Sequence, residues 1–451
     1  MNTIIKNAQI LNLNDDGISL KKGEIYIEND TIREVVYHVN NDGCDSNSSN
    51  NSSGGSDEGQ GVETKVIDAC GNVIMPGFKD AHTHSAMTLM RSFADDLPLQ
   101  NWLNDKIFPL EAHLTEEYVY WGSRLAILEY LTSGITANFD MYMKNDANVK
   151  ASVDSGFRTV LCGSINNFGG TVADMEQEFL KYNKASNPSQ SDLISYKFGF
   201  HAEYTTSREI LEGMAGLANK YREPIFTHNS ETKKEVEECI GRYNMTPTCF
   251  FDSLGMFNYG GGLYHCVHMT DDDLKVCKDK NVYVVTNPGS NVKLASGIAP
   301  IQKMLDMGIN IAIGTDGPAS NNCLDMFREM FLMTALQKVS IPDASACDAN
   351  EVLKSATYVG AKCMHLDDCA EVKAGQKADL IMIDLNQPNM QPIHNIPKNI
   401  VYSGSKQNVV MTMVNGKVLY DHGKFDVGVS PEEIYAKAGE SIKAMVAKVN
   451  G

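Results

Sequence analysis

Between residues 76 and 364 the chain repeats one pattern, in which a short apolar segment is followed by a longer amphipathic one. The apolar segments are typical of strands buried on both faces, and the amphipathic segments are typical of helices that cover such strands. Eight repeats predict an α/β fold in which parallel strands close into a (β/α)8 barrel. We expect the strands to end near residues 80–84, 136–140, 160–162, 198–201, 225–228, 263–266, 282–286 and 311–316.

The two ends of the chain share a different pattern, short β-like runs separated by turn residues. The simplest arrangement joins these runs in one small β-sandwich domain beside the barrel. The last stretch of the chain has the periodicity of a helix. The predicted division is therefore residues 1–75 and 371–428 for the β domain, 76–370 for the barrel and 429–451 for a C-terminal helix.

Residues 40–64 are dominated by Asn, Ser, Gly and Asp. A segment of this composition buries too little apolar surface to offset the entropy that ordering would cost. We therefore expect a flexible surface loop without a functional role.

The formal net charge of −18 argues against two classes of partner. An acidic surface repels both the phosphates of nucleic acids and anionic lipids. The sequence contains no run of about 18 apolar residues, so we expect no membrane span. The first residues favour a strand over a signal peptide. Eleven scattered cysteines without a Cys-x-x-Cys pair are typical of a reducing compartment, so we expect a cytoplasmic protein.

The first predicted barrel strand ends in the sequence Asp80-Ala81-His82-Thr83-His84. Residues two apart in a strand face the same side, so both imidazoles can point into the mouth of the barrel. Imidazole nitrogens bind zinc or Fe(II). A His-x-His pair alone occurs more often as ordinary surface or core histidines, but its position at the end of a barrel strand favours a metal site.

Two further strand ends carry residues of the same chemistry. His228 follows an apolar strand and offers a third ligand, and Glu231 lies three residues later, where a carboxyl group can move a proton. Asp316 ends the last apolar run, where a carboxylate is costly unless it is paired or binds a cation. Taken singly, Glu231 could be an acid at a helix N-terminus and Asp316 a turn residue.

The sixth predicted strand ends in His265-Cys266-Val267-His268. Only one of the two histidines is expected to face the barrel mouth. We assign that position to His265, which lies nearer the strand, and a structural role in the next turn to His268. The two assignments could be reversed.

These elements together resemble the amidohydrolase superfamily, and within it the group of 5′-methylthioadenosine/S-adenosylhomocysteine deaminases and triazine chlorohydrolases. The resemblance extends from the N-terminal strands to about residue 417. Each element alone is weakly specific, but five in this order are highly specific. The matching segments are residues 76–84, 201–205, 228–231, 265–268 and 314–322.

The resemblance implies a role for each matching residue. It implies one divalent metal ion, which is zinc or alternatively iron. It also implies that an adenine ring loses ammonia in a hydrolysis with proton transfers at N1 and C6. Trp102 would cover the pocket, although packing between helices explains it equally well. The implied metal ligands are His82, His84, His228 and Asp316; the catalytic residues are Glu231, His265 and Asp316; the substrate contacts are Glu111, His201, Glu231, Trp102 and Ser320.

One departure from the family pattern bears on the substrate. Deaminases that accept S-adenosylhomocysteine place an arginine after the third strand, where this chain has Gly163. An arginine would bind the substrate carboxylate with two hydrogen bonds. Arg158, five residues earlier, is not expected to replace it. Within the set of adenine nucleosides that includes S-adenosylhomocysteine, we favour 5′-methylthioadenosine, 5′-deoxyadenosine and adenosine.

Other functions remain open at this point. Guanine, pterin, triazine or cyclic amide rings could react by the same metal chemistry. A binuclear hydantoinase or dihydroorotase would need a bridging group, often a carboxylated lysine, but the fourth strand ends in His201 and Lys197 lies four residues earlier. A non-catalytic scaffold should have lost metal ligands, and none is missing. The expected partner is a small nucleoside, and a homo-oligomer is possible.

Overall fold

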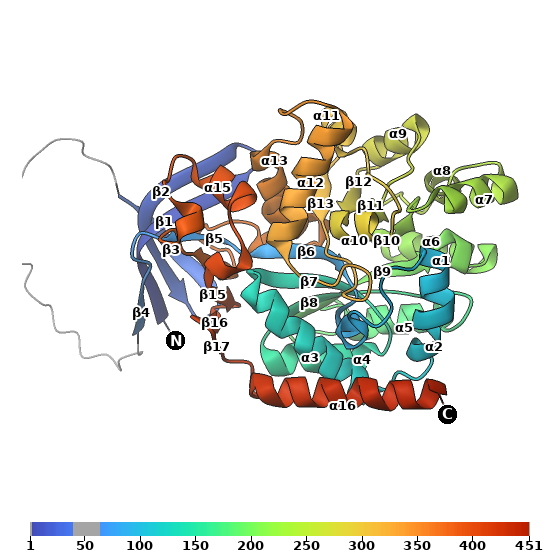
Figure 1. Cartoon of the computed structure of the whole chain (residues 1–451), viewed down its shortest axis with the longest axis horizontal. Coiled ribbons are helices and arrows are strands. Elements are labelled where there is room, and N and C mark those ends of the chain that lie inside the picture. The colour runs from blue at the N-terminus through green and yellow to red at the C-terminus, as the bar shows by residue number, and fades with distance from the viewer. Residues whose placement is uncertain (1, 39–63, 451) are drawn as a thin grey trace, which may run out of the picture.

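The computed structural model describes residues 2–38 and 64–450 (Figure 1). The flexible loop predicted at residues 40–64 therefore lies outside the described residues, except for Thr64. That residue begins strand β4 (Thr64–Asp68).

Eight parallel strands in sequence order form the barrel, as the alternating pattern predicts. The first and last strands lie side by side, because the backbone N–H of Asp316 donates to the carbonyl of His82 (3.0 Å). The prediction of a (β/α)8 barrel is confirmed. The strands are β6 (Phe78–Thr83), β7 (Ile135–Met141), β8 (Arg158–Cys162), β9 (Ile194–Ala202), β10 (Ile225–Asn229), β11 (Gly261–His265), β12 (Val282–Thr286) and β13 (Ile311–Ile313).

Helices follow the barrel strands and cover the barrel from outside (Figure 1). Several begin at a Thr or Ser whose side chain accepts a backbone N–H of the first turn, which stabilises the helix start. The helices up to β13 are α1 (Leu99–Asn101), α2 (Phe108–Glu111), α3 (Glu116–Thr132), α4 (Asn145–Ser155), α5 (Val172–Tyr182), α6 (Arg208–Tyr221), α7 (Lys233–Tyr243), α8 (Pro247–Ser253), α9 (Asp271–Asp279), α10 (Pro288–Lys293) and α11 (Ile301–Asp306).

The helices after the barrel strands include the C-terminal helix predicted from periodicity. This helix packs along α3 (Figure 1) and contributes Met445 to the apolar cluster that also contains Trp102. Within the described residues, no helix combines the length and the apolar character that crossing a membrane requires. These helices are α12 (Met326–Ser340), α13 (Ala349–Lys354), α14 (Gly360–Cys363), α15 (Ile396–Tyr402) and α16 (Pro431–Asn450).

Strands from both chain ends form a second, mixed sheet beside the barrel (Figure 1). Its middle strands come from opposite ends of the chain, because β5 pairs with β1 on one side and with β14 on the other. This confirms that the two ends join in one β unit; the exact domain boundaries remain a prediction. In the described residues the other strands are β1 (Asn2–Asn14), β2 (Gly17–Glu28), β3 (Thr31–Tyr37), β5 (Val73–Pro76), β14 (Leu380–Ile383), β15 (Val409–Val414), β16 (Lys417–Asp421) and β17 (Lys424–Phe425).

A buried ion pair joins the barrel to this sheet. Arg158, the first residue of β8, donates two hydrogen bonds to the carboxylate of Asp379 (2.6 and 3.1 Å) and one to Asn415 Oδ1 (3.1 Å). The backbone N–H of Asn415 also donates to Asp379 (2.7 Å). Burial alone would raise the pKa of Asp379, but the guanidinium and these hydrogen bonds outweigh it and hold the pKa below its ordinary value.

We predict that Asp379→Asn lowers the free energy of unfolding by roughly 3–5 kcal/mol, because it leaves the Arg158 charge buried without a partner. The wild-type ion pair stabilises the fold fully above the unfolded pKa of about 3.9, and this stability is lost as the pH falls through the lower folded pKa. Urea denaturation at neutral and acidic pH measures both effects. Asp279→Asn, which breaks the exposed pair with Lys275, is the control and should cost less than about 1 kcal/mol. Equal losses in the two variants would contradict the prediction.

Candidate active site

Four predicted metal ligands meet at the carboxyl ends of the barrel strands. His82 lies on β6 and His84 directly follows it, while His228 lies on β10 and Asp316 follows β13. One ligand atom from each of the four lies within 4.8 Å of the others, and all four side chains are buried. The structure therefore brings together the complete set that the sequence predicts.

Backbone carbonyls orient two of the imidazoles. Nδ1 of His84 lies 2.5 Å from the carbonyl oxygen of Met141, and Nδ1 of His228 lies 2.6 Å from that of His201. Because a carbonyl oxygen only accepts, each Nδ1 must carry the proton. In the neutral form of each ring, Nε2 then has the lone pair that a metal ion needs.

The surroundings of His82 test whether the residues fit a cation. Its ring is fully buried and stacks on Tyr264, with centroids 3.7 Å apart. Among the described residues, neither ring nitrogen has a hydrogen-bond partner. Burial lowers the pKa of His82 to about 3, so the ring is neutral. A buried neutral imidazole without a partner is costly, and a divalent ion would satisfy it.

The carboxylate of Asp316 is divided between two sets of neighbours. Its Oδ1 lies 3.5 Å from His82 Nε2 and 3.2 Å from His84 Nε2. Its Oδ2 accepts hydrogen bonds from Ser290 Oγ (2.5 Å) and Ser320 Oγ (3.0 Å). One oxygen thus faces the imidazoles while the other is held by hydroxyl groups. In this structure the hydroxyl of Ser320, predicted to contact substrate, donates to Asp316.

Glu231 and His265 lie beside this group. Nε2 of His265 is 4.0 Å from Glu231 Oε2, and the ring of His265 stacks on that of His228 with centroids 5.5 Å apart. Nδ1 of His265 lies 2.8 Å from Asn291 Oδ1, an acceptor, so Nδ1 carries the proton. His268 instead directs Nε2 to the carbonyl oxygen of Ser296 (2.9 Å). This geometry places His265, of the two, next to the ligands.

A buried acid on α7 fixes the backbone that carries Glu231. The carboxylate of Glu235 accepts the N–H groups of Ser230 (2.8 Å) and Glu231 (2.9 Å), and Ser296 Oγ donates to Glu231 Oε1 (2.9 Å). Burial raises the pKa of Glu235 to about 7. Sequence reasoning missed Glu235, although Thr232 three residues earlier forms the Thr-x-x-Glu pattern of a helix start.

The predicted substrate contacts lie at different depths. Tyr142, whose ring is 6.2 Å from that of His84, donates a hydrogen bond to Glu111 Oε1 (2.7 Å). The ring of His201 lies 4.8 Å from that of His228. Trp102 is buried in the apolar cluster with α16, so its packing role is visible in the structure. Glu111 and His201 are thus close to the ligand group.

No arginine reaches the site from β8 or the loop after it. A Cβ atom at Gly163 would lie 2.8 Å from the carbonyl oxygen of Gly199, too close for a side chain there. Arg158, the only arginine in residues 158–171, is bonded to Asp379 at the opposite end of the strand. Gly163, where the family resemblance leads us to expect an arginine, is therefore closely packed against the backbone of Gly199.

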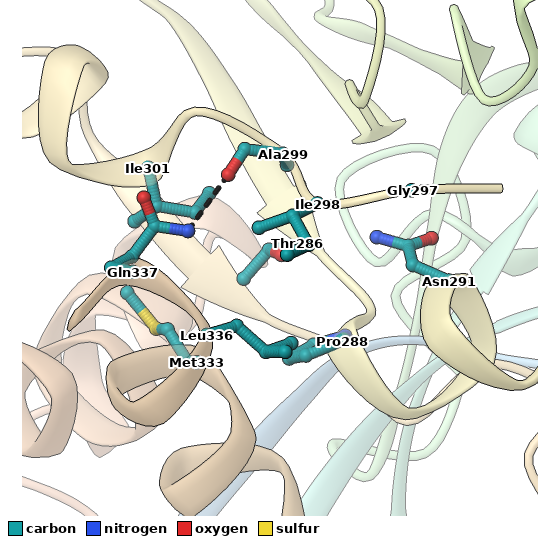
Figure 2. Close-up of a pocket in the computed structure, with 10 residues that line it drawn as sticks. All are labelled: Thr286, Pro288, Asn291, Gly297, Ile298, Ala299, Ile301, Met333, Leu336 and Gln337. Carbon is teal, nitrogen blue, oxygen red and sulfur yellow. Dashed lines mark hydrogen bonds between the residues drawn. The ribbon is translucent and has the colours of Figure 1, made fainter. Parts of the chain in front are cut away.

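Sequence reasoning also missed the residues that follow β12. Ser290, Asn291 and Ser296 contact Asp316, His265 and Glu231, respectively, and no motif marks them. Figure 2 shows the small cavity beside this segment, which is lined by β12, the segment and the helices α11 and α12. There Gln337 donates a hydrogen bond to the carbonyl of Ala299 (2.8 Å). The metal ligands do not line this cavity.

Comparison with known proteins agrees with this geometry. The sequence model of the amidohydrolase family matches residues 73–419. The chain is 39% identical over 450 residues to a 5′-deoxyadenosine deaminase of Methanobrevibacter smithii, covering 98% of each chain. It is 38% identical over 441 residues to a 5-methylthioadenosine/S-adenosylhomocysteine deaminase of Caldanaerobacter subterraneus subsp. tengcongensis, covering 96% of each.

A solved structure is similar over almost the same length. It is an adenosine deaminase of Xanthomonas campestris with bound zinc, with a TM-score of 0.88, 28% identity and coverage of 99% of this chain and 98% of that one. The barrel, the ligand cluster and these matches agree, and the family model alone spans more than half of the sequence. The chain belongs to the amidohydrolase family.

Proposed function

We propose that the protein is a metal-dependent hydrolytic deaminase that converts an adenine nucleoside into the inosine-type nucleoside and ammonia. The observation that carries the proposal is the cluster of three imidazoles and one carboxylate, whose ligand atoms lie within 4.8 Å of one another. Glu231 and His265 next to the cluster supply the groups that proton transfer needs. The names of the two curated relatives favour adenine among the possible rings.

In this proposal one divalent ion is held by the four ligands described above. Three imidazoles and a carboxylate suit zinc, which the related adenosine deaminase contains, and Fe(II) accepts the same donors. When bound, the ion lowers the pKa of a water molecule towards neutrality.

The protein's own groups move the protons. Glu231 protonates N1 of the adenine ring, which makes C6 open to attack by water. Asp316 accepts a proton from the attacking water and passes it to the departing amine, while His265 orients the water through Nε2 because Nδ1 is held by Asn291. The C6–O bond forms, the C6–N bond breaks and ammonia leaves, so that water supplies the oxygen of the product. The proton still on that oxygen passes to Glu231, which restores its acid form, while N1 keeps the proton that Glu231 gave it.

Substrate positioning falls to residues around the cluster. Glu111 can accept hydrogen bonds from the ribose hydroxyls, and the hydrogen bond from Tyr142 to Oε1 holds its carboxylate in place. His201 directs Nδ1 to Thr205 Oγ1 (2.9 Å), which fixes its ring beside His228. The close packing of Gly163 against Gly199 leaves no side chain there to bind an anion, which favours a nucleoside without a carboxylate at the 5′ position. We therefore favour 5′-methylthioadenosine, 5′-deoxyadenosine and adenosine over S-adenosylhomocysteine.

One observation argues against the binuclear alternative. Lys197, the lysine nearest the end of β9, forms an ion pair with Glu223 (2.7 Å) and is thereby held away from the four ligands. It is not positioned to bridge two metal ions.

The ten cysteines in the described residues are free, which supports the proposed cytoplasmic location. A homo-oligomeric state remains a prediction.

We predict that Glu231→Gln lowers kcat for ammonia release by about a hundredfold or more, because glutamine cannot donate the proton that N1 requires. The metal content should stay at the wild-type level, because Glu231 is not a ligand in this proposal. Glu237→Gln, on the exposed face of α7, is the matched control and should keep full activity. An unchanged rate for Glu231→Gln would remove this residue from the proposed role.

We expect close to one zinc or iron ion per active chain, measured by elemental analysis of the purified protein. Removing the ion with a chelator should stop ammonia release, and adding zinc should restore it. The reason is that the ion lowers the pKa of the attacking water. Two ions per active chain would instead support the binuclear alternative.

Substrate preference is tested by an ammonia-release screen over adenosines, guanine, cytosine and triazines. Nucleosides with a neutral 5′ group should have a kcat/KM at least about ten times that of S-adenosylhomocysteine. The chain has glycine at position 163, so no arginine there can bind the carboxylate. The methyl ester of S-adenosylhomocysteine, which is similar in size but lacks the carboxylate charge, is the matched control. The ester should react faster than the acid, and a preference for the acid would contradict the prediction.

A further inference from the structure

A buried glutamate on α12 connects the two loops that support the proposed site. Glu329 is fully buried. Its Oε2 accepts the backbone N–H of Gly289 (2.7 Å), at the start of α10. Its Oε1 accepts Asn321 Nδ2 (2.9 Å), in the loop after β13. One carboxylate thus joins segments that follow neighbouring barrel strands.

The first of these segments carries two supporting side chains. Gly289 immediately precedes Ser290, whose hydroxyl donates to Asp316 Oδ2 (2.5 Å). Asn291 follows on the same short helix, and its Oδ1 lies 2.8 Å from His265 Nδ1. Gly289 therefore belongs to the same short helix as the hydroxyl that donates to Asp316 and the amide oxygen that faces His265.

The second segment contacts the same aspartate. Asn321 Nδ2 also donates to the carbonyl of Thr315 (2.7 Å), the residue before Asp316. Its neighbour Ser320 donates to Asp316 Oδ2 (3.0 Å). Asp316 itself has a left-handed backbone conformation (φ 59°), which non-glycine residues adopt only when the surroundings hold them there.

The packing around Glu329 leaves little freedom. A Cβ atom at Gly289 would lie 2.4 Å from Glu329 Oε1 and 2.4 Å from Asn321 Oδ1, so only glycine allows this close approach. Burying the carboxyl group of Glu329 also costs free energy, because the group loses its hydration and needs hydrogen bonds to offset that loss. Its two N–H donors supply them, and both belong to the loops around the site.

We propose that Glu329 is a positioning residue that fixes Asp316 and His265 relative to each other without touching the substrate. The inference rests on the proposed function for the roles of those two residues. It goes beyond that function by assigning the alignment of the site to a residue on the outer helix layer.

Glu329→Gln tests the inference, because the amide has the same shape but replaces one acceptor oxygen with a donor. We expect kcat to fall about tenfold or more with little change in KM, and the zinc-loaded protein to lose zinc to a chelator about tenfold faster. The control is Asp273→Asn, another fully buried acid, which accepts the backbone N–H of Thr270 (2.8 Å) at the start of α9. Its thermal stability should fall while its kcat and zinc release stay at wild-type values.

A double-mutant cycle shows whether Glu329 acts through the loop. The effects of Glu329→Gln and Ser290→Ala on zinc release should combine to less than their product, whereas those of Glu329→Gln and Asp273→Asn should multiply. Should the glutamine variant fail to fold, Glu329→Asp retains the charge with a shorter reach and should give intermediate losses. Wild-type zinc release and kcat in either Glu329 variant, or fully multiplicative effects with Ser290→Ala, would overturn the inference.

The two proposals can fail separately. A wild-type protein that binds zinc but releases no ammonia from any nucleoside would contradict the proposed function. The zinc-release comparison would still decide whether Glu329 positions Asp316, because it does not depend on the substrate.

Discussion

Three imidazoles and a carboxylate lie together in a space from which most water is excluded, and the rest of the site depends on how their lone pairs are directed. Each buried polar atom needs a partner, so the protein must supply one for every atom that is not meant for the ion. The carbonyls of Met141 and His201 occupy two Nδ1 atoms, and hydroxyl groups occupy Asp316 Oδ2. One ligand atom from each of the four side chains lies within 4.8 Å of the others. This division of partners suits the cluster to a cation.

The two ends of the barrel strands differ in what they contact. Strand β8 shows the contrast within one element, because Arg158 at its start is neutralised by Asp379 while Gly163 beyond its end has no side chain. The first end joins the barrel to the terminal sheet and contributes stability. The other end faces the side of the barrel that carries the candidate site. The separation lets the loops at the catalytic end vary without disturbing the junction at the base.

The barrel could be predicted because its strands are short apolar runs, which form a local pattern in the sequence. The candidate ligands could be predicted because they lie at the ends of these strands. The supporting residues were not predictable in this way. Asn291 and Glu329 form hydrogen bonds with His265 and Gly289, which are distant from them in the chain, and a single amide or acid on a helix has no distinguishing local pattern. Glu235 lies in a recognisable helix start, but that pattern does not say that its carboxylate holds the backbone of Glu231. Trp102 could not be decided because an aromatic residue on an amphipathic segment suits both a pocket and a core.

The pairing of β5 with both β1 and β14 has a consequence for how the protein is made. The N-terminal strands leave the ribosome long before β14 is synthesised, so they wait with an open edge while the whole barrel emerges. An unpaired edge of this kind can join other chains, which makes nascent and truncated molecules prone to aggregate. The terminal sheet can therefore be completed only after β14 to β17 have been translated.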